Sequence, residues 1–216
     1  MATADTHEKI LDAAESLFFH DGIAVTGVDR VARTAGVSVV TLYKHMGSKD
    51  GLLCGVLQRR LDAWGRVWQE HVEAAEDPRE KVLAIFDALA AFRYQAHPTQ
   101  WCTFLATASE RAATEDEPGA LVEADTALLL DRLRPLAADA DPARAAWIVD
   151  ATVLLYNGAL SSLLRSHPTH PAAVGRDTAC LAFGWTDLLR TTGSRANSPT
   201  YNVGLGQDPG KDRSAR

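Results

Sequence analysis

The chain has 216 residues, 46% of them hydrophobic, and its 22 basic and 28 acidic side chains leave a formal net charge of −6 at pH 7. This length suits one or two domains with a substantial buried core. The first residues, MATADTHEK, show no basic leader followed by an apolar stretch, so the sequence indicates no secretory signal. The three cysteines are odd in number and far apart, which favours free, buried thiols in a reducing cytoplasm, with redox sensing by one of them as the alternative: Cys54, Cys102 and Cys180.

A first helix is expected from about Thr6 to His20, ended by Gly22. Its apolar residues recur at helical spacing and form one stripe, made of Ile10, Leu11, Ala14, Leu17 and Phe18. This stripe predicts the core of a small N-terminal unit.

A second, short helix is expected to follow Thr26. This residue can be its N-cap, with Asp29 reaching back as in a capping box. Gly36 can end the helix in the left-handed conformation. Ser38 can then cap a third helix, from Val39 to about His45. Two helices joined by a four-residue turn with glycine form the pattern of a helix-turn-helix DNA-binding motif.

The charge of this segment supports the same interpretation. Residues 30–49 contain four basic side chains and no acidic one, a local charge of +4 in an acidic chain: Arg30, Arg33, Lys44 and Lys49. Phosphate neutralisation with counterion release supplies most of the affinity for nucleic acid. A basic segment in an acidic protein is therefore where a polyanion would bind.

Residues 7–53 resemble the N-terminal DNA-binding domain of the TetR family of transcriptional regulators. The matching motifs are Ile10–Ala14 with Leu17 and Phe18, Gly22, Thr26, Val31-Ala32, Ala35-Gly36-Val37-Ser38, Thr41–His45, Ser48-Lys49-Asp50 and Leu52-Leu53. The resemblance implies an all-α fold with a three-helix helix-turn-helix domain over residues 1–50. A helical effector-binding and dimerisation domain is expected over residues 51–192, followed by a flexible tail over residues 193–216, which is rich in Gly, Ser, Pro and charge.

The resemblance also implies which side chains contact DNA. The positions expected to face bases or the groove wall are Ser38, Val39, Val40, Thr41 and Lys44. The two valines can contact thymine methyl groups, and the lysine can donate to guanine N7 or O6. The positions expected to hold phosphates are Thr26, Tyr43, His45 and Lys49. Tyr43 as a packed aromatic, His45 as a solvated helix end and Lys49 as a plain surface lysine are the alternatives.

Three residues depart from the family pattern. Gly27 stands where a second hydroxyl residue is usual, so one donor to phosphate is missing. Met46 replaces an aromatic residue. Gly51 lies early in the next helix, where glycine costs roughly 1 kcal/mol of helix stability.

The remainder of the chain reads as helices separated by proline or acidic breaks. A long helix from Ser48 to about Ala75 is expected to link the two domains. The later helices are expected over Arg79–Ala96, Thr99–Thr114, Ala120–Ala138 with a kink near Pro135, Pro142–Ser166 and Ala172–Thr191.

The segment 145–164 is long and apolar enough to be considered as a membrane-spanning helix. Asp150 near its middle and Asn157 argue against one, and no membrane association is expected. The family resemblance instead implies that the last two helices form a four-helix interface in a homodimer. The small residues that would allow close helix approach are Gly158, Ala159, Ser162 and Gly184.

An effector cavity is implied among the middle helices. Its expected ligand-binding residues are Trp64, Trp68, Phe86, Trp101, Phe104, Trp147, Tyr156 and Asn157, with Phe92, His97 and Thr103 as further candidates. The alternative for each aromatic is plain core packing. An aromatic or otherwise hydrophobic small molecule is the expected effector.

Signals of catalysis are weak. His167 and His170 are bracketed by prolines and have no third ligand nearby, and residues 115–117 read as a solvated acidic turn. The sequence carries no nucleophile-elbow signature, so no enzyme, cofactor or metal site is expected. The prediction is a cytoplasmic, homodimeric repressor that binds a palindromic DNA operator and is released by a small hydrophobic effector. The alternative is an all-helical small-molecule-binding or enzymatic domain without a DNA-binding role.

Overall fold

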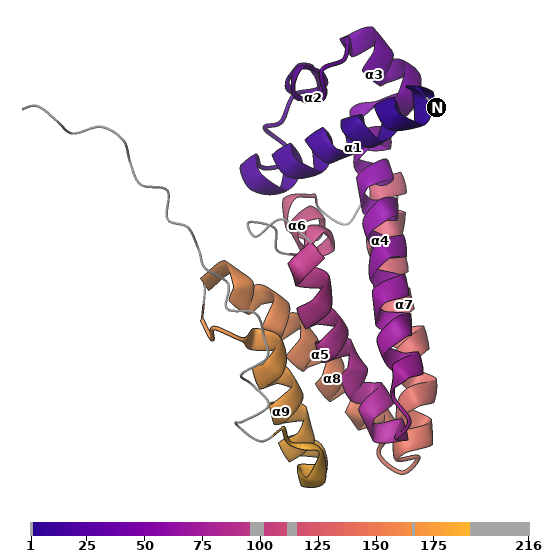
Figure 1. Cartoon of the computed structure of the whole chain (residues 1–216), viewed down its shortest axis with the longest axis vertical. Helices are drawn as coiled ribbons and strands as arrows, with labels where there is room; N and C mark the ends of the chain where they lie inside the picture. Colours follow the sequence, from indigo (N-terminus) through magenta and orange to yellow (C-terminus); the bar gives the residue numbers. More distant parts are fainter. Residues whose placement is uncertain (1, 96–101, 112–115, 166, 191–216) are drawn as a thin grey trace, which may run out of the picture.

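The computed structural model describes residues 2–95, 102–111, 116–165 and 167–190, and every regular element in these ranges is a helix (Figure 1). The predicted all-α fold class is confirmed. The helices are α1 (Ala2–Asp21), α2 (Val28–Ala35), α3 (Val39–Met46), α4 (Lys49–Ala74), α5 (Pro78–Gln95), α6 (Thr103–Glu110), α7 (Glu117–Ala140), α8 (Ala145–Ser162) and α9 (Pro171–Phe183), with short 3₁₀ turns η1 (Leu163–Arg165) and η2 (Thr186–Leu188).

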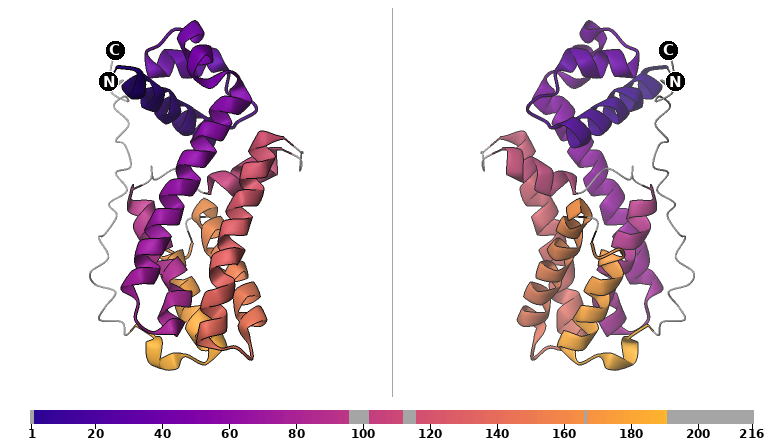
Figure 2. Two further views of the ribbon diagram at one scale, coloured as in Figure 1. Left: turned by 90° about the vertical axis from the view of Figure 1, so that its right-hand side faces the viewer. Right: turned by 90° about the vertical axis from the view of Figure 1, so that its left-hand side faces the viewer.

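The helices α1–α3 form a head at one end of the elongated molecule, and α4 runs from this head along a bundle made with α5, α7, α8 and α9 (Figures 1 and 2). The helix α6 lies between the head and the bundle (Figure 1). This arrangement places the helix-turn-helix at the tip, away from the bundle.

Two clusters of buried apolar side chains hold this arrangement, and α4 belongs to both. The head core combines α1–α3 with the first turns of α4, through Leu52, Leu53, Val56 and Leu57. The bundle core takes the later part of α4, through Trp64, Val67, Trp68 and Val72. Each fully buried side chain of this size contributes roughly 1.5–3 kcal/mol. The helix is therefore firmly anchored in both cores. Its buried side chains belong to the head core up to Leu57 and to the bundle core from Trp64 onward. The domain boundary expected at residue 50 lies before this change.

Several predicted helix ends were wrong. The last helix, α9, ends at Phe183, well before the expected Thr191, because Gly184 takes a left-handed conformation (φ +73°) and closes it. Gly184 is thus not a close-packing residue within a helix. The helix α6 ends at Glu110 rather than Thr114. The start of α7 is earlier than expected because Asp116 caps it by accepting from the backbone N–H of Gly119 at 2.9 Å.

The presence of glycine at position 51 has a structural reason that helix propensity does not show. It lies in the first turn of α4, where its N–H donates to Ser48 Oγ at 2.8 Å. A Cβ atom built on Gly51 would overlap the backbone carbonyl oxygen of Met46, the last residue of α3. The turn between α3 and α4 is therefore so tight that only glycine fits at this position.

Replacing Gly51 with alanine is expected to destabilise the protein by about 1–3 kcal/mol, because a backbone atom has to move to make room. Helix propensity alone would stabilise it by roughly 1 kcal/mol. Urea unfolding measures the difference. Gly65→Ala on the same helix is the matched control, since its Cβ would meet Leu128 at an ordinary 3.6 Å, and it should gain about 0.5–1 kcal/mol. Equal stability of the two variants would contradict the steric argument.

Candidate nucleic-acid interface and ligand cavity

The orientation of α3 is set by backbone and capping contacts on both sides of a tight turn. Gly36 (φ +69°) ends α2, and the N–H of Val37 donates to Ala32 O at 2.9 Å. Ser38 Oγ then accepts from the N–H of Thr41 at 3.0 Å and begins α3. The two helix boundaries expected at Gly36 and Ser38 are thus confirmed, and the turn leaves little freedom between the helices.

The helix α3 has one buried and one exposed face. Leu42 and Met46 pack into the head core. On the other face Val40 is 79% exposed and Tyr43 is 44% exposed. Of the remaining predicted base-facing residues, Ser38 and Lys44 are exposed, whereas Thr41 and Val39 are half-buried, the last against the head core. The exposed face is the one available to a groove of DNA.

The residues predicted to hold phosphates differ in accessibility. Thr26 is fully buried, and its hydroxyl donates to Gly22 O at 2.7 Å and Leu17 O at 3.3 Å. Thr26 is also not the N-cap of α2, so that prediction was wrong; the cap is Gly27, whose lack of a side chain leaves no capping hydrogen bond. Lys49 Nζ donates to Ala24 O at 3.1 Å.

The side chains of Tyr43 and His45 lie on α3, and the His45 ring centroid is 6.1 Å from that of His7 on α1. The DNA-contact roles of all nine predicted residues stay predictions. The inward hydroxyl of Thr26 shows that its side chain reaches phosphate only after rearrangement.

One cation of the basic segment is already paired with an acidic side chain. Arg30 pairs with Asp21 at 2.7 Å. The hydrogen bond from His20 and the charge of Arg30 hold the pKa of the Asp21 carboxyl below its usual value. Among the described residues, no acidic side chain forms an ion pair with Arg33 or Lys44. These two exposed cations are therefore available for phosphate or base edges.

Polar contacts that sequence reasoning missed connect the head with the rest of the chain. Glu110, the last residue of α6, accepts from the backbone N–H of Ala24 in the loop before α2, at 3.0 Å. Its neighbour Arg111 pairs with Asp50 at the start of α4 and with Asp116 before α7, each at 2.6 Å. These partners lie far apart in sequence, so no local pattern could indicate them.

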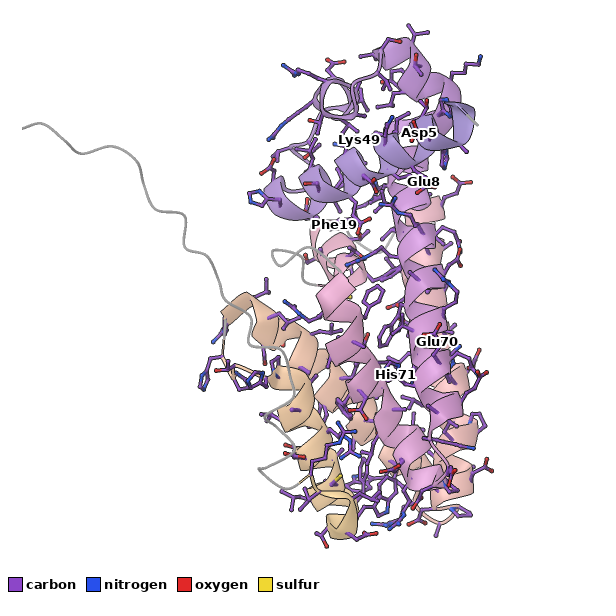
Figure 3. All side chains as sticks on the ribbon, viewed as in Figure 1. Asp5, Glu8, Phe19, Lys49, Glu70 and His71 are labelled. Carbon is purple, nitrogen blue, oxygen red and sulfur yellow. The ribbon has the colours of Figure 1, made fainter. Side chains whose placement is uncertain are left out.

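A second set of ion pairs joins α1 to α4. Arg59 contacts Asp12 at 2.7 Å, Glu8 at 3.1 Å and Glu15, while Arg60 contacts Glu15 at 3.3 Å. Glu15 is consequently shared between two neighbouring arginines. Figure 3 shows Glu8 at the junction of α1 with α4.

A cavity of about 50 Å³ lies between α4, α5, α6, α7 and α8. Its lining is Arg60, Trp64, Leu89, Phe92, Arg93, Cys102, Thr103, Phe104, Asp125, Tyr156, Leu160 and Leu163. The rings of Phe92 and Tyr156 lie 5.6 and 5.7 Å from that of Trp64. The structure thus brings together three of the predicted ligand-binding residues, Trp64, Phe104 and Tyr156, with the further candidates Phe92 and Thr103.

The other predicted ligand-binding residues lie elsewhere. Trp68 is fully buried and stacks on Trp64 at 5.8 Å. Phe86 fills the space beside Gly175, where a Cβ would come within 2.8 Å of its ring. Trp147 is partly exposed against Phe183, and Asn157 is half-buried on α8 outside the cavity lining. Trp101 and His97 fall outside the described residues.

The charged residues of the cavity were not foreseen. Arg60 and Arg93 contribute guanidinium groups, and Asp125 contributes a carboxyl whose pKa burial raises to about 6. The one signal in the sequence that points to Arg60 is its spacing, because it precedes Trp64 by about one helical turn and so shares a face of α4 with it. Burial also raises the pKa of the Cys54 and Cys102 thiols to about 11, which keeps them protonated and poorly reactive at neutral pH.

Metal and membrane signals are limited. The part of the chain that the structure describes contains no group of three His, Cys, Asp or Glu side chains able to hold a metal ion. Within the same residues, one helical stretch, Ala145–Arg165, is long and apolar enough to cross a membrane, which is weak evidence by itself. It packs against the chain's own α7 and α9.

A short helix with an exposed, cationic face, presented by a tight glycine turn at the tip of an all-helical chain, defines a helix-turn-helix DNA-binding regulator. The model of the bacterial regulatory proteins of the tetR family matches residues 10–54. The chain is 30% identical over 147 residues to the uncharacterized HTH-type transcriptional regulator Rv1255c of Mycobacterium tuberculosis, which covers 66% of this chain and 70% of that protein. The chain belongs to the TetR family of transcriptional regulators.

Further relatives and a solved structure agree. The transcriptional activator FasR and the transcriptional repressor KstR2 of Mycolicibacterium smegmatis are 33% and 32% identical over 92 and 95 residues. These matches cover 43% and 44% of this chain, and 41% and 45% of those proteins. The TetR-family regulator SCO4454 of Streptomyces coelicolor has the same fold, with a TM-score of 0.75 at 20% identity over 83% of this chain and 96% of that chain. Membership of this family confirms a helix-turn-helix transcriptional regulator that is not an enzyme.

Replacing Asp125 with asparagine is expected to stabilise the protein at neutral pH. Because the folded-state pKa is raised above the usual 3.8 to about 6, the native carboxyl holds its proton longer than the unfolded one, so stability falls as pH rises through this window. The variant should gain on the order of 1–3 kcal/mol at neutral pH and almost nothing near pH 4. Thermal unfolding across this pH range is the measurement. Asp131→Asn, exposed on the same helix, is the control; a pH-independent effect of Asp125→Asn would contradict the argument.

Proposed function

We propose that the protein is a cytoplasmic, homodimeric repressor that binds a palindromic operator and leaves it when a small molecule fills the bundle cavity. The observation that carries the proposal is the exposed face of α3, where Val40 and Lys44 project from a helix whose opposite face is locked into the head core. Two such helices, one from each subunit, would enter successive major grooves about 34–36 Å apart.

Exposed apolar side chains support the homodimer. Five of the large hydrophobic residues that are exposed in the described chain belong to α8, η1 and α9: Trp147, Leu154, Leu164, Val174 and Leu181. A second copy of these helices would cover them in a four-helix interface. Such a partner also accounts for the apolar character of α8 without a membrane.

The small residues expected at that interface have different surroundings. Gly158 is exposed, and a Cβ built on it would meet nothing within 4 Å, so a partner helix has room to approach there. Ala159 is buried in the chain's own bundle core. The Ser162 hydroxyl donates to Gly158 O at 2.7 Å within α8.

The helix α6 supplies a route from the cavity to the head. Thr103 and Phe104, at its first turn, line the cavity, and Glu110, at its other end, holds the loop before α2. Eight residues span about 12 Å. A ligand that displaces the first turn would move Glu110 and change the spacing of the two heads, provided that it binds the non-DNA form more tightly.

The sign of regulation follows from this coupling. A ligand that favours the form with misplaced heads lowers operator affinity, so the ligand-free protein is the DNA-binding form and acts as a repressor at a promoter-overlapping site. Both signs occur among similar proteins, as the names of FasR and KstR2 state. A reporter gene placed behind the DNA region upstream of the gene that encodes this protein should therefore be expressed more strongly when the regulator gene is deleted.

The DNA-binding role is tested by salt-dependent binding to duplex DNA taken from the region upstream of the gene that encodes this protein. Affinity should fall steeply between about 50 and 200 mM salt. Lys49→Ala should weaken operator and random DNA equally and reduce the salt slope by about 1, whereas Lys44→Ala should cost about 1–3 kcal/mol on the operator and relax base preference. Fluorescence anisotropy is the readout, with Lys81→Ala on α5 as control. If the protein shows no salt-dependent binding to DNA, the DNA-binding role is refuted. If Lys44→Ala lowers the affinity for operator and random DNA equally, base reading by Lys44 is refuted.

The double variant Leu154→Asp, Leu181→Asp should be monomeric. These side chains are 73% and 61% exposed in the single chain, so charge is tolerated by the fold but not in an apolar interface. Sedimentation velocity measures the mass in solution, and circular dichroism checks the fold. Val25→Asp, an exposed valine in the head, should leave the dimer intact. A dimeric double variant would place the interface elsewhere.

A further inference from the structure

We propose that the ligand of the bundle cavity is a small organic acid whose carboxylate is bound by Arg60 in competition with Glu15 of α1. This inference rests on the proposed ligand-responsive function and names the chemical class of its effector. Sequence reasoning expected only a hydrophobic molecule. The charges that line the cavity make an anion the better fit.

The charge balance of the cavity is the first observation. Its described lining holds two guanidinium groups, those of Arg60 on α4 and Arg93 on α5, and one acid, Asp125 on α7. Burial raises the pKa of Asp125 to about 6, so this carboxyl still carries its negative charge at neutral pH and loses it only in mild acid. Of these groups, the guanidinium of Arg60 is the one that would attract the carboxylate of a ligand, because it lies in the cavity wall and its ion pair with Glu15 is long.

Arg60 is a buried cation with an imperfect partner. Its side chain is 14% exposed, and burial lowers its pKa. The nearest oxygen of Glu15 lies 3.3 Å from its Nε, longer than the 2.7–2.9 Å usual for such pairs. The other oxygen of Glu15 accepts from Arg59. One carboxylate is thus divided between two guanidinium groups, and a ligand carboxylate can offer Arg60 a closer, two-pronged contact.

Aromatic rings set the shape of the rest of the ligand. The guanidinium carbon of Arg60 lies 4.9 Å from the centre of the Phe92 ring, which orients it beside Trp64 and Tyr156 in the cavity wall. A flat ring or short alkyl chain attached to the carboxylate would lie against these side chains. The volume of about 50 Å³ has room for only a few water-sized groups, so a ligand of the size of benzoate or hexanoate has to displace the cavity walls.

Other ligand classes fit less well. A protonated amine could pair with Asp125, but it would also lie beside the two guanidinium groups of the lining, whose positive charge repels it. A purely apolar molecule would make no charge-assisted hydrogen bond to Arg60. A carboxylic acid uses both the cations and the aromatic wall.

Competition for Arg60 would link the cavity to the head. Glu15 belongs to α1, so its contact with Arg60 is one of the ion pairs that hold α1 against α4. A ligand carboxylate that takes Arg60 leaves Glu15 to Arg59 alone and weakens this junction. By linkage, weakening the junction must in turn favour the ligand.

Isothermal titration of the full chain with benzoate and hexanoate, each against its neutral amide, and with benzylamine tests the charge preference. At least one acid should bind roughly tenfold or more tightly than its amide, the usual size of a charge-assisted hydrogen bond. If neither acid exceeds its amide, or if benzylamine binds best, the inference is overturned.

Variants of Arg60 test the residue. Arg60→Gln should remove the advantage of the acid and leave amide binding unchanged, and Arg60→Lys should retain part of it because the charge stays while the planar fork is lost. Arg66→Gln, exposed on the same helix, should behave as the unmodified chain. Amide binding and thermal unfolding show that each variant is folded. Full acid binding by a folded Arg60→Gln would overturn the assignment.

The link to the head has its own readout. Glu15→Gln should tighten binding of the acid several-fold because the competitor is gone, and an unchanged or weaker affinity would refute the competition. Anisotropy with operator DNA, measured without ligand, separates the two proposals. If the protein binds DNA but shows no preference for the acid, only this inference is refuted. If it binds the acid but does not bind DNA, only the proposed function is refuted.

Discussion

The simultaneous burial of α4 in two hydrophobic cores is the constraint on which the rest of the structure depends. Its first turns pack with the helix-turn-helix, through Leu52 and Leu53, and its later turns pack with the bundle, through Trp64 and Trp68. With 26 residues it spans about 39 Å as one continuous helix. Gly51 seats its start directly on the end of α3. The recognition helix is consequently positioned by a rigid element rather than by a loop.

Against this rigid element, the polar contacts between head and bundle are the adjustable part. Glu110, Arg59 and Arg60 reach the head from α6 and α4. The exposed ion pairs of Arg59 with Glu8 and Asp12 contribute about 0–1 kcal/mol each, far less than the cores. They can favour one arrangement of the head and still yield to a ligand. Stability and switching thus lie in different interactions of the same molecule.

The helix-turn-helix was predictable because its signals are local. Ser38 accepts a hydrogen bond from a residue three positions on, and Gly36 closes its own helix, so both contacts are written in a few consecutive residues. The cavity was predictable only in part. Aromatic residues are natural candidates for an apolar wall, but Arg60 reads as a surface residue, since arginines are seldom buried without partners. Its partner Glu15 lies on another helix.

The sequence by itself determined the helical class, the order of the helices, the basic recognition segment and, through its motifs, the family. Periodicity and capping carry this information because they act over a turn or two of chain. Only the tertiary structure decided which way side chains face: Thr26 points its hydroxyl inward, Ala159 packs into its own bundle, and Arg60 lies between Glu15 and the cavity. Those outcomes depend on which helices meet across the fold, and no stretch of neighbouring residues contains them.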